Sequence, residues 1–365
     1  MRVLFVQNRA NKAGAQVCLA LIIKALKGSG IETKVIIGEE GWLSDRLRIL
    51  DVLGGIAPFP SLRSLPSRLL KLGPFMKAAD IVWKTHGPFH IINANDTWDA
   101  LLAEKLALKW KIPWIVHLRS ITTPEQPHQH YLKYHCNKAD AAVAVSPSSF
   151  QTVLAWDHRL LEYIPEGLSE DTFSSPYEKE ILFPYEIGVV GHSGTIKGWA
   201  DIAAAFKKVK ERRGALPRKI HFFGKASTGC QNEIREEMPS DIQVVFEGHV
   251  DNLTDYLRSL DLVISPSRQE SFGMSVLEAI AAGTPVLASR TGIVPDIMGC
   301  DSPWTFLPGN PEHLAITWMN IPSFWNTRND YLLKWQEIII KDYSIDALYG
   351  KLVKLYRKVL ELHKS

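Results

Sequence analysis

Short runs of apolar residues alternate with amphipathic stretches along most of the chain. The first half predicts a helix over residues 16–27 and strands over residues 3–6, 34–37, 90–92, 114–116 and 141–145. The second half predicts strands over residues 187–190, 220–223, 244–246, 262–265 and 286–288. Apolar strands that alternate with helical segments are typical of parallel sheets built from β-α-β units.

The pattern breaks once, between the two series of strands. The first series stops near residues 163–167, and an irregular stretch that contains proline follows to residue 185. We therefore predict two doubly wound α/β domains, the first over residues 1–166 and the second over residues 167–344.

The carboxyl end carries a strongly amphipathic pattern. Five apolar residues recur there at steps of four and three: Leu348, Leu352, Leu355, Val359 and Leu362. This spacing places them on one face of a helix. We expect that helix, over residues 345–365, to cross back to the first domain and complete it.

Composition adds that the chain is typical of a soluble enzyme. It has 365 residues, of which 46% are hydrophobic and 22% charged, and these values indicate neither disorder nor a fibrous repeat. The first strand reaches polar Gln7 too early for a secretion signal, and no apolar run is long enough to predict a membrane span. The four cysteines are scattered, so we expect reduced thiols in a cytoplasmic protein: Cys18, Cys136, Cys230 and Cys300.

Charge is distributed unevenly between the two halves. Residues 1–165 hold 20 Lys and Arg against 13 Asp and Glu, a balance of +7, and the remaining 22 against 26 give −4, which agrees with the net +3. A basic first half suits an anionic acceptor or membrane surface, and it equally suits ordinary solvated surface. Nucleic acid is a poor candidate partner, because the basic residues are dispersed and no stacking motif accompanies them.

Residues 63–86 mix basic residues with apolar ones. Such a segment could rest on an anionic bilayer, or it could be a surface segment that covers the first sheet. Gly73 and Pro74 interrupt it, so we expect any helix there to come in two short pieces.

The segment over residues 261–289 carries the most chemical information. It predicts a strand that Pro266 ends, a loop that contains Glu270, and a helix over 274–282 that Gly283 stops. Ligands of open α/β sheets bind at the carboxyl ends of strands, and helix amino termini attract phosphate. Glu278 lies about one turn into this helix, so both carboxylates can accept hydrogen bonds from hydroxyl groups.

Glu270 and Glu278 have the E-x7-E spacing of family 4 retaining glycosyltransferases, and the residues around them resemble that family's signature closely. The resemblance implies the GT-B fold, in which two Rossmann-like domains face each other across a cleft. It also implies that Glu270 binds hydroxyls of the donor sugar and that Glu278 binds the nucleotide ribose. The amides of four residues would contact the sugar and diphosphate: Phe272, Gly273, Met274 and Ser275.

Two further segments resemble the same family. The loop over 191–198 is similar to a Gly-Arg…Lys-Gly loop whose two cations neutralise the leaving diphosphate; Lys197 matches, and His192 stands where the family has Arg. Since histidine is largely neutral at pH 7, position 192 departs from the pattern. The turn over 246–250 resembles the segment that holds the base, which implies contacts from the backbone of Gly248, His249 and Val250.

The first half resembles the family more loosely. Gly14 occupies the place of a Gly-Gly loop, with one glycine remaining, and His117 matches a histidine that reaches the transferred sugar. Glu166 departs from an inter-domain segment that usually reads Ile-Pro-Asn-Gly.

The resemblance implies retaining transfer from a nucleotide-diphosphate-sugar co-substrate without a metal ion. No second carboxylate is evident in the position of a covalent nucleophile, so front-face attack is our working hypothesis, and we expect a glycan or lipid-linked acceptor. A histidine cluster near His128, His130, His135 and Cys136 offers metal-ligand types but lacks a metal-binding spacing, so we interpret it as a polar, mobile loop. Two rival functions stay open: a nucleotide-sugar epimerase of the same fold, and a nucleotide-sugar-binding protein that has lost catalysis. Analysis of products would separate them.

Overall fold

The computed structural model describes residues 1–59, 65–119, 129–169, 172–176, 183–250 and 252–364. The chain divides into two compact units, which consist of Met1–Gly167 with Tyr343–Ser365 and of Leu168–Asp342. Each unit contains one sheet in which all strand pairs are parallel. The predicted pair of parallel α/β sheets is therefore confirmed.

The sheet of the first unit has seven strands in the order β3-β2-β1-β4-β5-β6-β7. Their bounds are β1 Arg2–Gln7, β2 Glu32–Ile37, β3 Leu53–Ile56, β4 Ile91–Ala94, β5 Trp114–Leu118, β6 Ala141–Ala144 and β7 Leu161–Tyr163. The strand order reverses between β1 and β4, as in doubly wound folds. Sequence reasoning missed β3 and β7, which are short and only partly buried.

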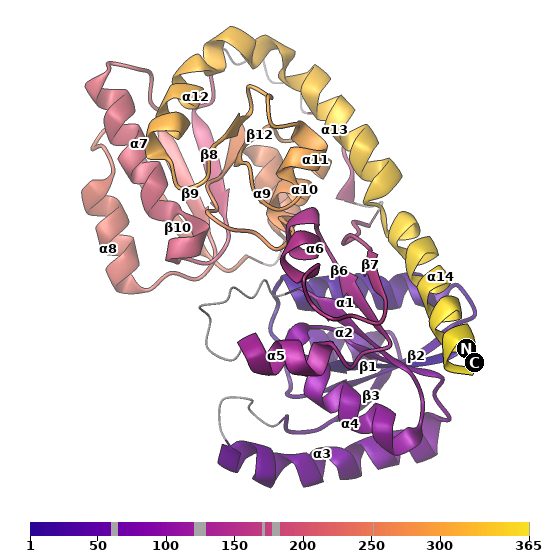
Figure 1. Cartoon of the computed structure of the whole chain (residues 1–365). Helices are drawn as coiled ribbons and strands as arrows, with labels where there is room; N and C mark the ends of the chain where they lie inside the picture. The colour runs from indigo at the N-terminus through magenta and orange to yellow at the C-terminus, as the bar shows by residue number, and fades with distance from the viewer. Residues whose placement is uncertain (60–64, 120–128, 170–171, 177–182, 251, 365) are drawn as a thin grey trace. The chain divides into compact units, whose positions relative to one another are not determined.

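Helices cover both faces of this sheet (Figure 1). One face packs against α1 (Gly14–Lys27), α2 (Trp42–Ile49) and α14 (Ile345–Lys364), with Phe5 and Leu352 in the shared core. The other face packs against α3 (Leu65–His86) and α4 (Ala100–Trp110), with Phe75 and Val116 in the core. The connections from β5 and β6 contain α5 (Gln129–Cys136) and α6 (Pro147–Val153), and η1 (Thr97–Asp99) precedes α4.

The last helix, α14, belongs to the first unit although it ends the chain. Four residues of its predicted apolar face are buried in the core shared with α1: Leu348, Leu352, Leu355 and Val359. The fifth, Leu362, is 42% exposed.

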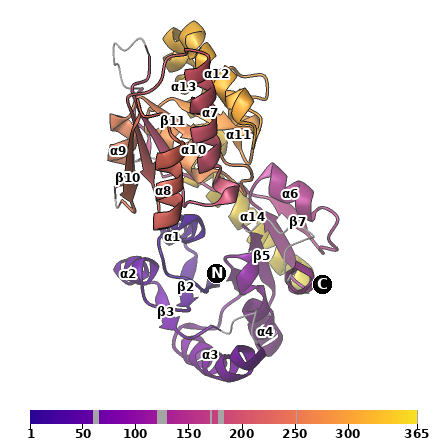
Figure 2. The ribbon, with the colours of Figure 1, turned by 90° about the vertical axis from the view of Figure 1, so that its left-hand side faces the viewer.

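The expectation of two short helical pieces over residues 63–86 is wrong, because α3 continues through Pro74. A proline inside a helix removes one backbone hydrogen bond and strains the preceding turn. The helix continues because Phe75, Ala79 and Val82, spaced at four and three residues, are all buried against the sheet. Figure 2 shows α3 beside α4, and an ion pair between Lys109 and Asp80 joins the two helices.

The sheet of the second unit has six strands in the order β10-β9-β8-β11-β12-β13. Their bounds are β8 Glu186–Val190, β9 Lys219–Phe223, β10 Gln243–Gly248, β11 Leu262–Ser265, β12 Val286–Ser289 and β13 Thr305–Phe306. The predicted strand over 262–265 is matched residue for residue. The two-residue β13 was not predicted, since it is too short to show a pattern.

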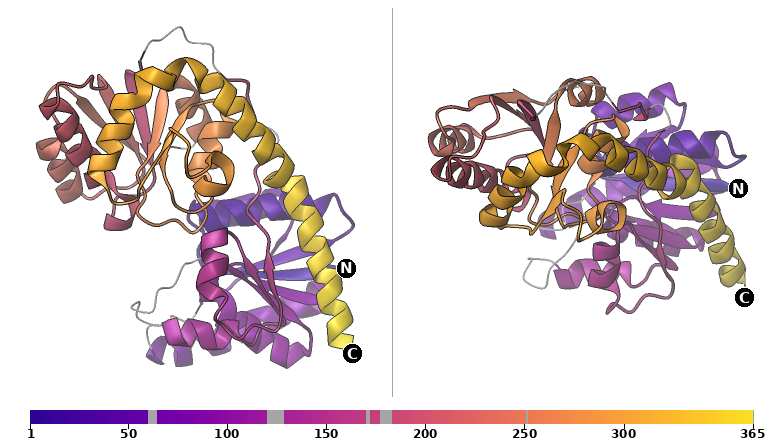
Figure 3. Two further views of the ribbon diagram at one scale, coloured as in Figure 1. Left: turned by 45° about the horizontal axis from the view of Figure 1, so that its top comes forward. Right: turned by 90° about the horizontal axis from the view of Figure 1, so that it is seen from above.

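Two groups of helices accompany this second sheet (Figure 3). The first group is α7 (Trp199–Glu211), α8 (Thr228–Glu237) and α12 (Pro311–Phe324), in which α7 contacts both others. The second is α9 (Leu253–Ser259), α10 (Met274–Ala281), α11 (Val294–Met298) and α13 (Arg328–Asp342), in which α10 contacts α9 and α13. Two short 3-10 turns complete the unit, η3 (Thr195–Lys197) and η4 (Trp325–Thr327).

Among the described helices, none combines the length and apolar character that crossing a membrane requires.

Candidate functional site

The second sheet reverses its strand order between β8 and β11. In open α/β sheets, ligands bind beside the carboxyl ends of the strands at such a reversal. The loops that leave these two strands, residues 191–198 and 266–273, are therefore the first place to look for a site.

An ion pair joins the two loops. Lys197 Nζ lies 2.5 Å from Glu270 Oε1, and the hydroxyl of Ser267 donates to the same oxygen at 2.7 Å. Glu270 keeps 12% of its side chain exposed and Lys197 keeps 34%. Two of the predicted site residues, which lie 73 positions apart in the chain, are thus brought together.

The backbones of the two loops also fix each other. The amide of Arg268 donates to the carbonyl of Ile196 at 2.7 Å. Gly198 has a φ of +66°, and a side chain there would collide with the carbonyl oxygen of Pro266. The guanidinium of Arg268 makes two hydrogen bonds, at 2.9 and 2.6 Å, to the carboxylate of Asp201 in the first turn of α7. Sequence reasoning missed this second ion pair, since nothing in the pattern indicated which acid Arg268 would meet.

The loop after β11 leads into α10 through Gly273, which has a φ of +110°. No side chain caps this helix, and the amides of Val276 and Leu277 already bond to the carbonyl of Gly273. The amides of Met274 and Ser275 come first in the helix and have no acceptor within it. Helix amino termini of this kind favour anions. Glu278 is half-buried one turn further on.

Phe272 is the remaining one of the four residues whose amides are predicted to contact the sugar and diphosphate. The loop that follows β12 fixes its position. Its carbonyl accepts a hydrogen bond from the amide of Ile293 at 2.8 Å. Gly292 has a φ of +57°, and a side chain there would collide with the same carbonyl. The stretch over 290–293, to which sequence reasoning assigned no site, therefore supports the backbone just before α10.

Glycines stand at the ends of the neighbouring strands β8, β9 and β10: Gly191 and Gly224 follow β8 and β9, and Gly248 is the last residue of β10. Gly191 and Gly224 both have a φ of +137°, and Gly248 has a φ of +69°. The amide of Gly224 donates to the carbonyl of Gly248 at 2.7 Å. A side chain at Gly224 would collide with the carbonyl of Gly191. The glycines let the three strand ends lie close together, and His249 is exposed at the end of the row.

His192 is a neutral hydrogen-bonding group in this structure. Its Nδ1 accepts a hydrogen bond from the amide of Lys225 at 3.2 Å, so the ring proton is on Nε2. Partial burial, followed by the charges of Lys225 and Lys197, lowers the pKa of His192 below its ordinary value. The Nε2–H group is the donor that this residue can offer a ligand.

The two remaining predicted residues, His117 and Gly14, lie in the first unit. His117 is 1% exposed near the end of β5, and its Nε2 lies 3.4 Å from the side-chain nitrogen of Asn93. Burial, followed by the charge of Arg119, lowers the pKa of His117 well below its ordinary value, so the ring is neutral. Gly14 begins α1, and a side chain at Gly14 would meet no atom within 4 Å.

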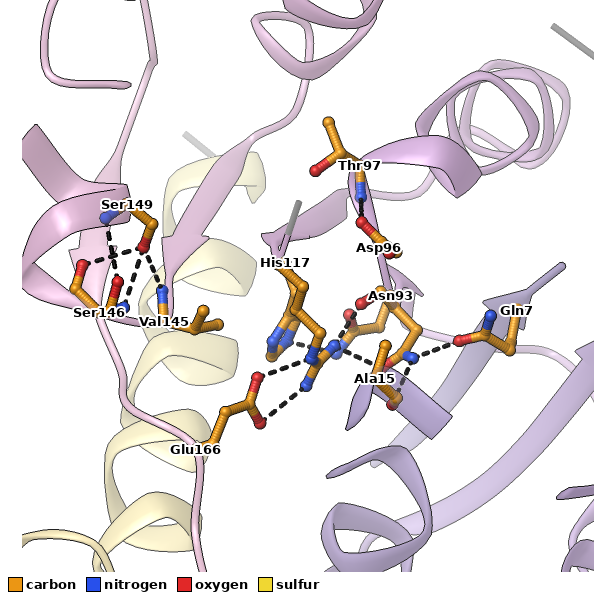
Figure 4. A network of polar contacts seen from close by, with 12 residues as sticks. Gln7, Ala15, Asn93, Asp96, Thr97, His117, Val145, Ser146, Ser149 and Glu166 are labelled. Carbon is orange, nitrogen blue, oxygen red and sulfur yellow. Dashed lines mark hydrogen bonds and ion pairs between the residues drawn. The ribbon is translucent and has the colours of Figure 1, made fainter. Parts of the chain in front are cut away.

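Buried polar side chains gather around His117 at the reversal of the first sheet (Figure 4). Arg119 bonds to both oxygens of Glu166, at 2.7 and 3.2 Å, and to the side-chain oxygen of Asn95 at 2.5 Å. Asn95 in turn donates to Gln7 at the end of β1. Sequence reasoning missed this cluster, although Glu166 had been noted as a departure from the family pattern.

The cluster also includes the carboxyl-terminal helix. The side-chain nitrogen of Asn93 donates to the hydroxyl of Tyr356 in α14 at 2.8 Å. Burial raises the pKa of Tyr356, so its hydroxyl stays protonated. Asn93 thus connects α14 with His117.

The histidine cluster that we interpreted as a mobile loop is partly helical, and this interpretation is corrected. Within the described residues, α5 begins at Gln129 and buries Leu132 and Cys136 one turn apart. His135 is held by Glu104 of α4, and His128 lies outside the described residues. Among the described His, Cys, Asp and Glu side chains, no group of three could hold a metal ion.

Residues 184–320 match the family model described as glycosyl transferases group 1. The chain is 29% identical over 226 residues to an uncharacterized glycosyltransferase of Methanocaldococcus jannaschii, a match that covers 60% of this chain and 53% of the relative. It is 25% identical over 334 residues to the 2-deoxystreptamine N-acetyl-D-glucosaminyltransferase of Streptomyces fradiae, with 81% and 79% covered. The chain spans about half the length of the first of these relatives.

Solved structures agree over almost the whole chain. Anabaena HepE in complex with UDP and glucose matches with a TM-score of 0.79 and 17% identity, covering 98% of this chain and all of that one. Sucrose-phosphate synthase from Thermosynechococcus elongatus matches with a TM-score of 0.78 and 16% identity, covering 98% of this chain and 99% of that one. These identities establish the fold alone.

In sequence, the chain is thus similar to group 1 glycosyltransferases over residues 184–320 and to curated glycosyltransferases over longer stretches. The solved structures confirm the predicted fold class, two Rossmann-like domains of the GT-B type.

The buried pair of Arg119 and Glu166 gives a prediction on stability. We expect Glu166→Gln to lower the free energy of unfolding by about 3–5 kcal/mol, because it leaves the buried guanidinium without its counter-charge. The matched control is Glu162→Gln, which breaks an exposed pair with Lys358 and is expected to cost about 0–1 kcal/mol. Urea denaturation measures both, and equal small losses would contradict the prediction.

Proposed function

We propose that this protein is a retaining glycosyltransferase that moves a hexose-type sugar from a nucleotide-diphosphate-sugar to a glycan or lipid-linked acceptor. The observation that carries the proposal is the ion pair between Lys197 and Glu270 at the strand reversal, beside the uncapped start of α10. A cation, a carboxylate and free helix amides at one strand edge suit a ligand that carries both phosphates and hydroxyl groups. Polysaccharide or cell-envelope glycan synthesis is the setting that we propose.

In this proposal the second unit holds the donor. Glu278 accepts hydrogen bonds from the ribose, and Glu270 accepts them from hydroxyls of the sugar. The amides from Phe272 to Ser275 contact the sugar and diphosphate, and the backbone over 248–250 contacts the base. The resemblance to the family signature over 261–289 supports these roles. So does the position of the loop over 266–273 and the turn over 248–250 at the carboxyl edge of the sheet.

The proposed reaction breaks the bond between the anomeric carbon and the phosphate oxygen. The diphosphate leaves with the electron pair, the acceptor oxygen bonds to the anomeric carbon on the same face, and the acceptor proton passes to the diphosphate. The chain stabilises the charge that develops on the leaving group, through Lys197, the Nε2–H of His192 and the first amides of α10. We propose that these groups do this without a metal ion.

We propose that the first unit binds the acceptor, with His117 and Gly14 as its site residues. His117 is buried at the carboxyl end of β5. Contact with the sugar therefore requires that its ring become exposed when substrates bind.

We also propose that the first unit rests on an anionic, cytoplasmic membrane surface through α3. The outer face of this helix carries exposed Lys77, Ile81 and Lys84 at spacings of four and three, and Ile81 is 65% exposed. Lysines beside an exposed apolar side chain suit the headgroup region of a bilayer.

The donor proposal predicts a specific thermal shift. Saturation with the correct donor among UDP-, GDP-, ADP- and dTDP-sugars should raise the unfolding midpoint by several degrees, because a ligand at ~100 times its dissociation constant stabilises by ~2.7 kcal/mol. Glu278→Ala should abolish this shift. Glu236→Ala, an exposed glutamate of α8, should retain it. No shift with any donor would overturn the proposal; hydrolysis or epimerisation of the donor without transfer would favour the rival functions.

The membrane proposal predicts that Lys77→Ala/Lys84→Ala weakens binding to phosphatidylserine-rich vesicles about 10- to 30-fold, since each lysine near such a surface contributes about 1 kcal/mol. Vesicle sedimentation measures the affinity. Lys207→Ala/Lys210→Ala, which removes two exposed lysines of α7, is the matched control and should bind as the unaltered protein does. Equal binding to neutral and anionic vesicles would contradict the proposal.

A further inference from the structure

The loop after β9, residues 224–227, carries an exposed lysine to which neither the motifs nor the comparisons assign a role. It runs from Gly224 to Ser227, which caps α8 by accepting a hydrogen bond from the amide of Cys230. Lys225 thus lies at the carboxyl edge of the second sheet, in the loop that follows β9, the strand next to β8.

Lys225 is fixed to the loop that contains His192 by two hydrogen bonds. Its amide donates to Nδ1 of His192 at 3.2 Å, and its carbonyl accepts from the amide of Ser193 at 2.9 Å. The backbone at position 225 therefore cannot move independently of the loop over 191–198. Because a lysine side chain is long and flexible, its ammonium group can reach ligands in front of that loop.

Lys197 and His192 together provide too little positive charge to balance a bound diphosphate. His192 cannot easily become cationic, because its Nδ1 already accepts a hydrogen bond and its pKa is lowered, by partial burial first and then by Lys225. Lys197 is paired with Glu270 at 2.5 Å. A nucleotide diphosphate carries at least two negative charges. One lysine that is already paired and one neutral imidazole do not balance them, so further positive charge is needed at this edge.

Lys225 differs from the lysines of the neighbouring helix α7. Lys207, Lys208 and Lys210 all form ion pairs, with Glu237, Glu312 and Asp241. Within the ranges that the structure describes, by contrast, no Asp or Glu forms an ion pair with Lys225. An exposed cation that no described carboxylate pairs with, fixed beside a loop at the strand reversal, is suited to an anionic ligand.

We infer that Lys225 is a diphosphate-binding residue of the donor site, and that His192 and Lys225 act as a pair. The lysine supplies the charge, and the imidazole supplies the neutral Nε2–H donor and holds the lysine's backbone in place. This inference rests on the proposed function, because it assumes that a nucleotide-diphosphate-sugar binds at the second unit.

The experiment compares a nucleoside diphosphate with its monophosphate by calorimetry, using the base that gives the thermal shift. Lys225→Met should weaken binding of the diphosphate about 10- to 100-fold, as loss of a charged hydrogen bond does. The monophosphate should lose less, so the ratio of the two affinities should shrink. Lys225→Arg keeps the charge and should retain most of the affinity, while Lys207→Met removes an equal charge from α7 and should change nothing.

A rescue variant separates a charge contact from a structural effect. Lys225→Met/His192→Arg places a permanent cation on the neighbouring loop and should recover most of the lost diphosphate affinity. The inference is overturned if Lys225→Met binds the diphosphate as the unaltered protein does while Glu278→Ala loses it, a result that leaves the proposed function standing. It is also overturned if both nucleotides weaken equally without rescue. If the unaltered protein binds no nucleoside diphosphate, the proposed function fails and the inference fails with it.

Discussion

The candidate site depends on the close approach of two loops at the strand reversal of the second sheet. Gly198 must be a glycine because the carbonyl of Pro266 occupies the space of a side chain, and that approach brings Lys197 to Glu270. The ion pair fixes the two side chains relative to each other. A bound donor would exchange this ion pair for two interactions: the lysine would bind phosphate, and the carboxylate would accept hydrogen bonds from sugar hydroxyls.

At the strand reversal of the first sheet, buried polar side chains bond to one another. In the second sheet, by contrast, two loops meet there through a close backbone contact. Arg119 joins Asn95 to Glu166, and Glu166 is two residues before the second unit begins at Leu168. Gly167 in turn lies against the backbone of Ser344 and Ile345, where the chain returns to the first unit. The segment that leaves the first unit is therefore fixed by the buried ion pair and by the backbone of the segment that returns to this unit.

Local pattern was sufficient for much of the fold and for part of the site. The strand over 262–265 and the helix after Gly273 were predictable because apolar runs end there at Pro266 and Gly283. The contact of His192 with Lys225 was not, because it depends on which strands are neighbours in the sheet, and sequence spacing does not give strand order. The helix α3 was divided wrongly at Pro74, since buried packing on either side outweighs one lost hydrogen bond.

We propose that the donor binds at the carboxyl edge of the second sheet. Hydrogen exchange of the backbone amides, with and without the nucleoside diphosphate that shifts the unfolding midpoint, tests this directly. We predict slower exchange in the loops after β8, β9, β10 and β11, strongest over residues 191–198 and 272–275, where loop and helix amides would donate to phosphate. Protection at the opposite edge of this sheet, or in the first unit alone, would contradict the account.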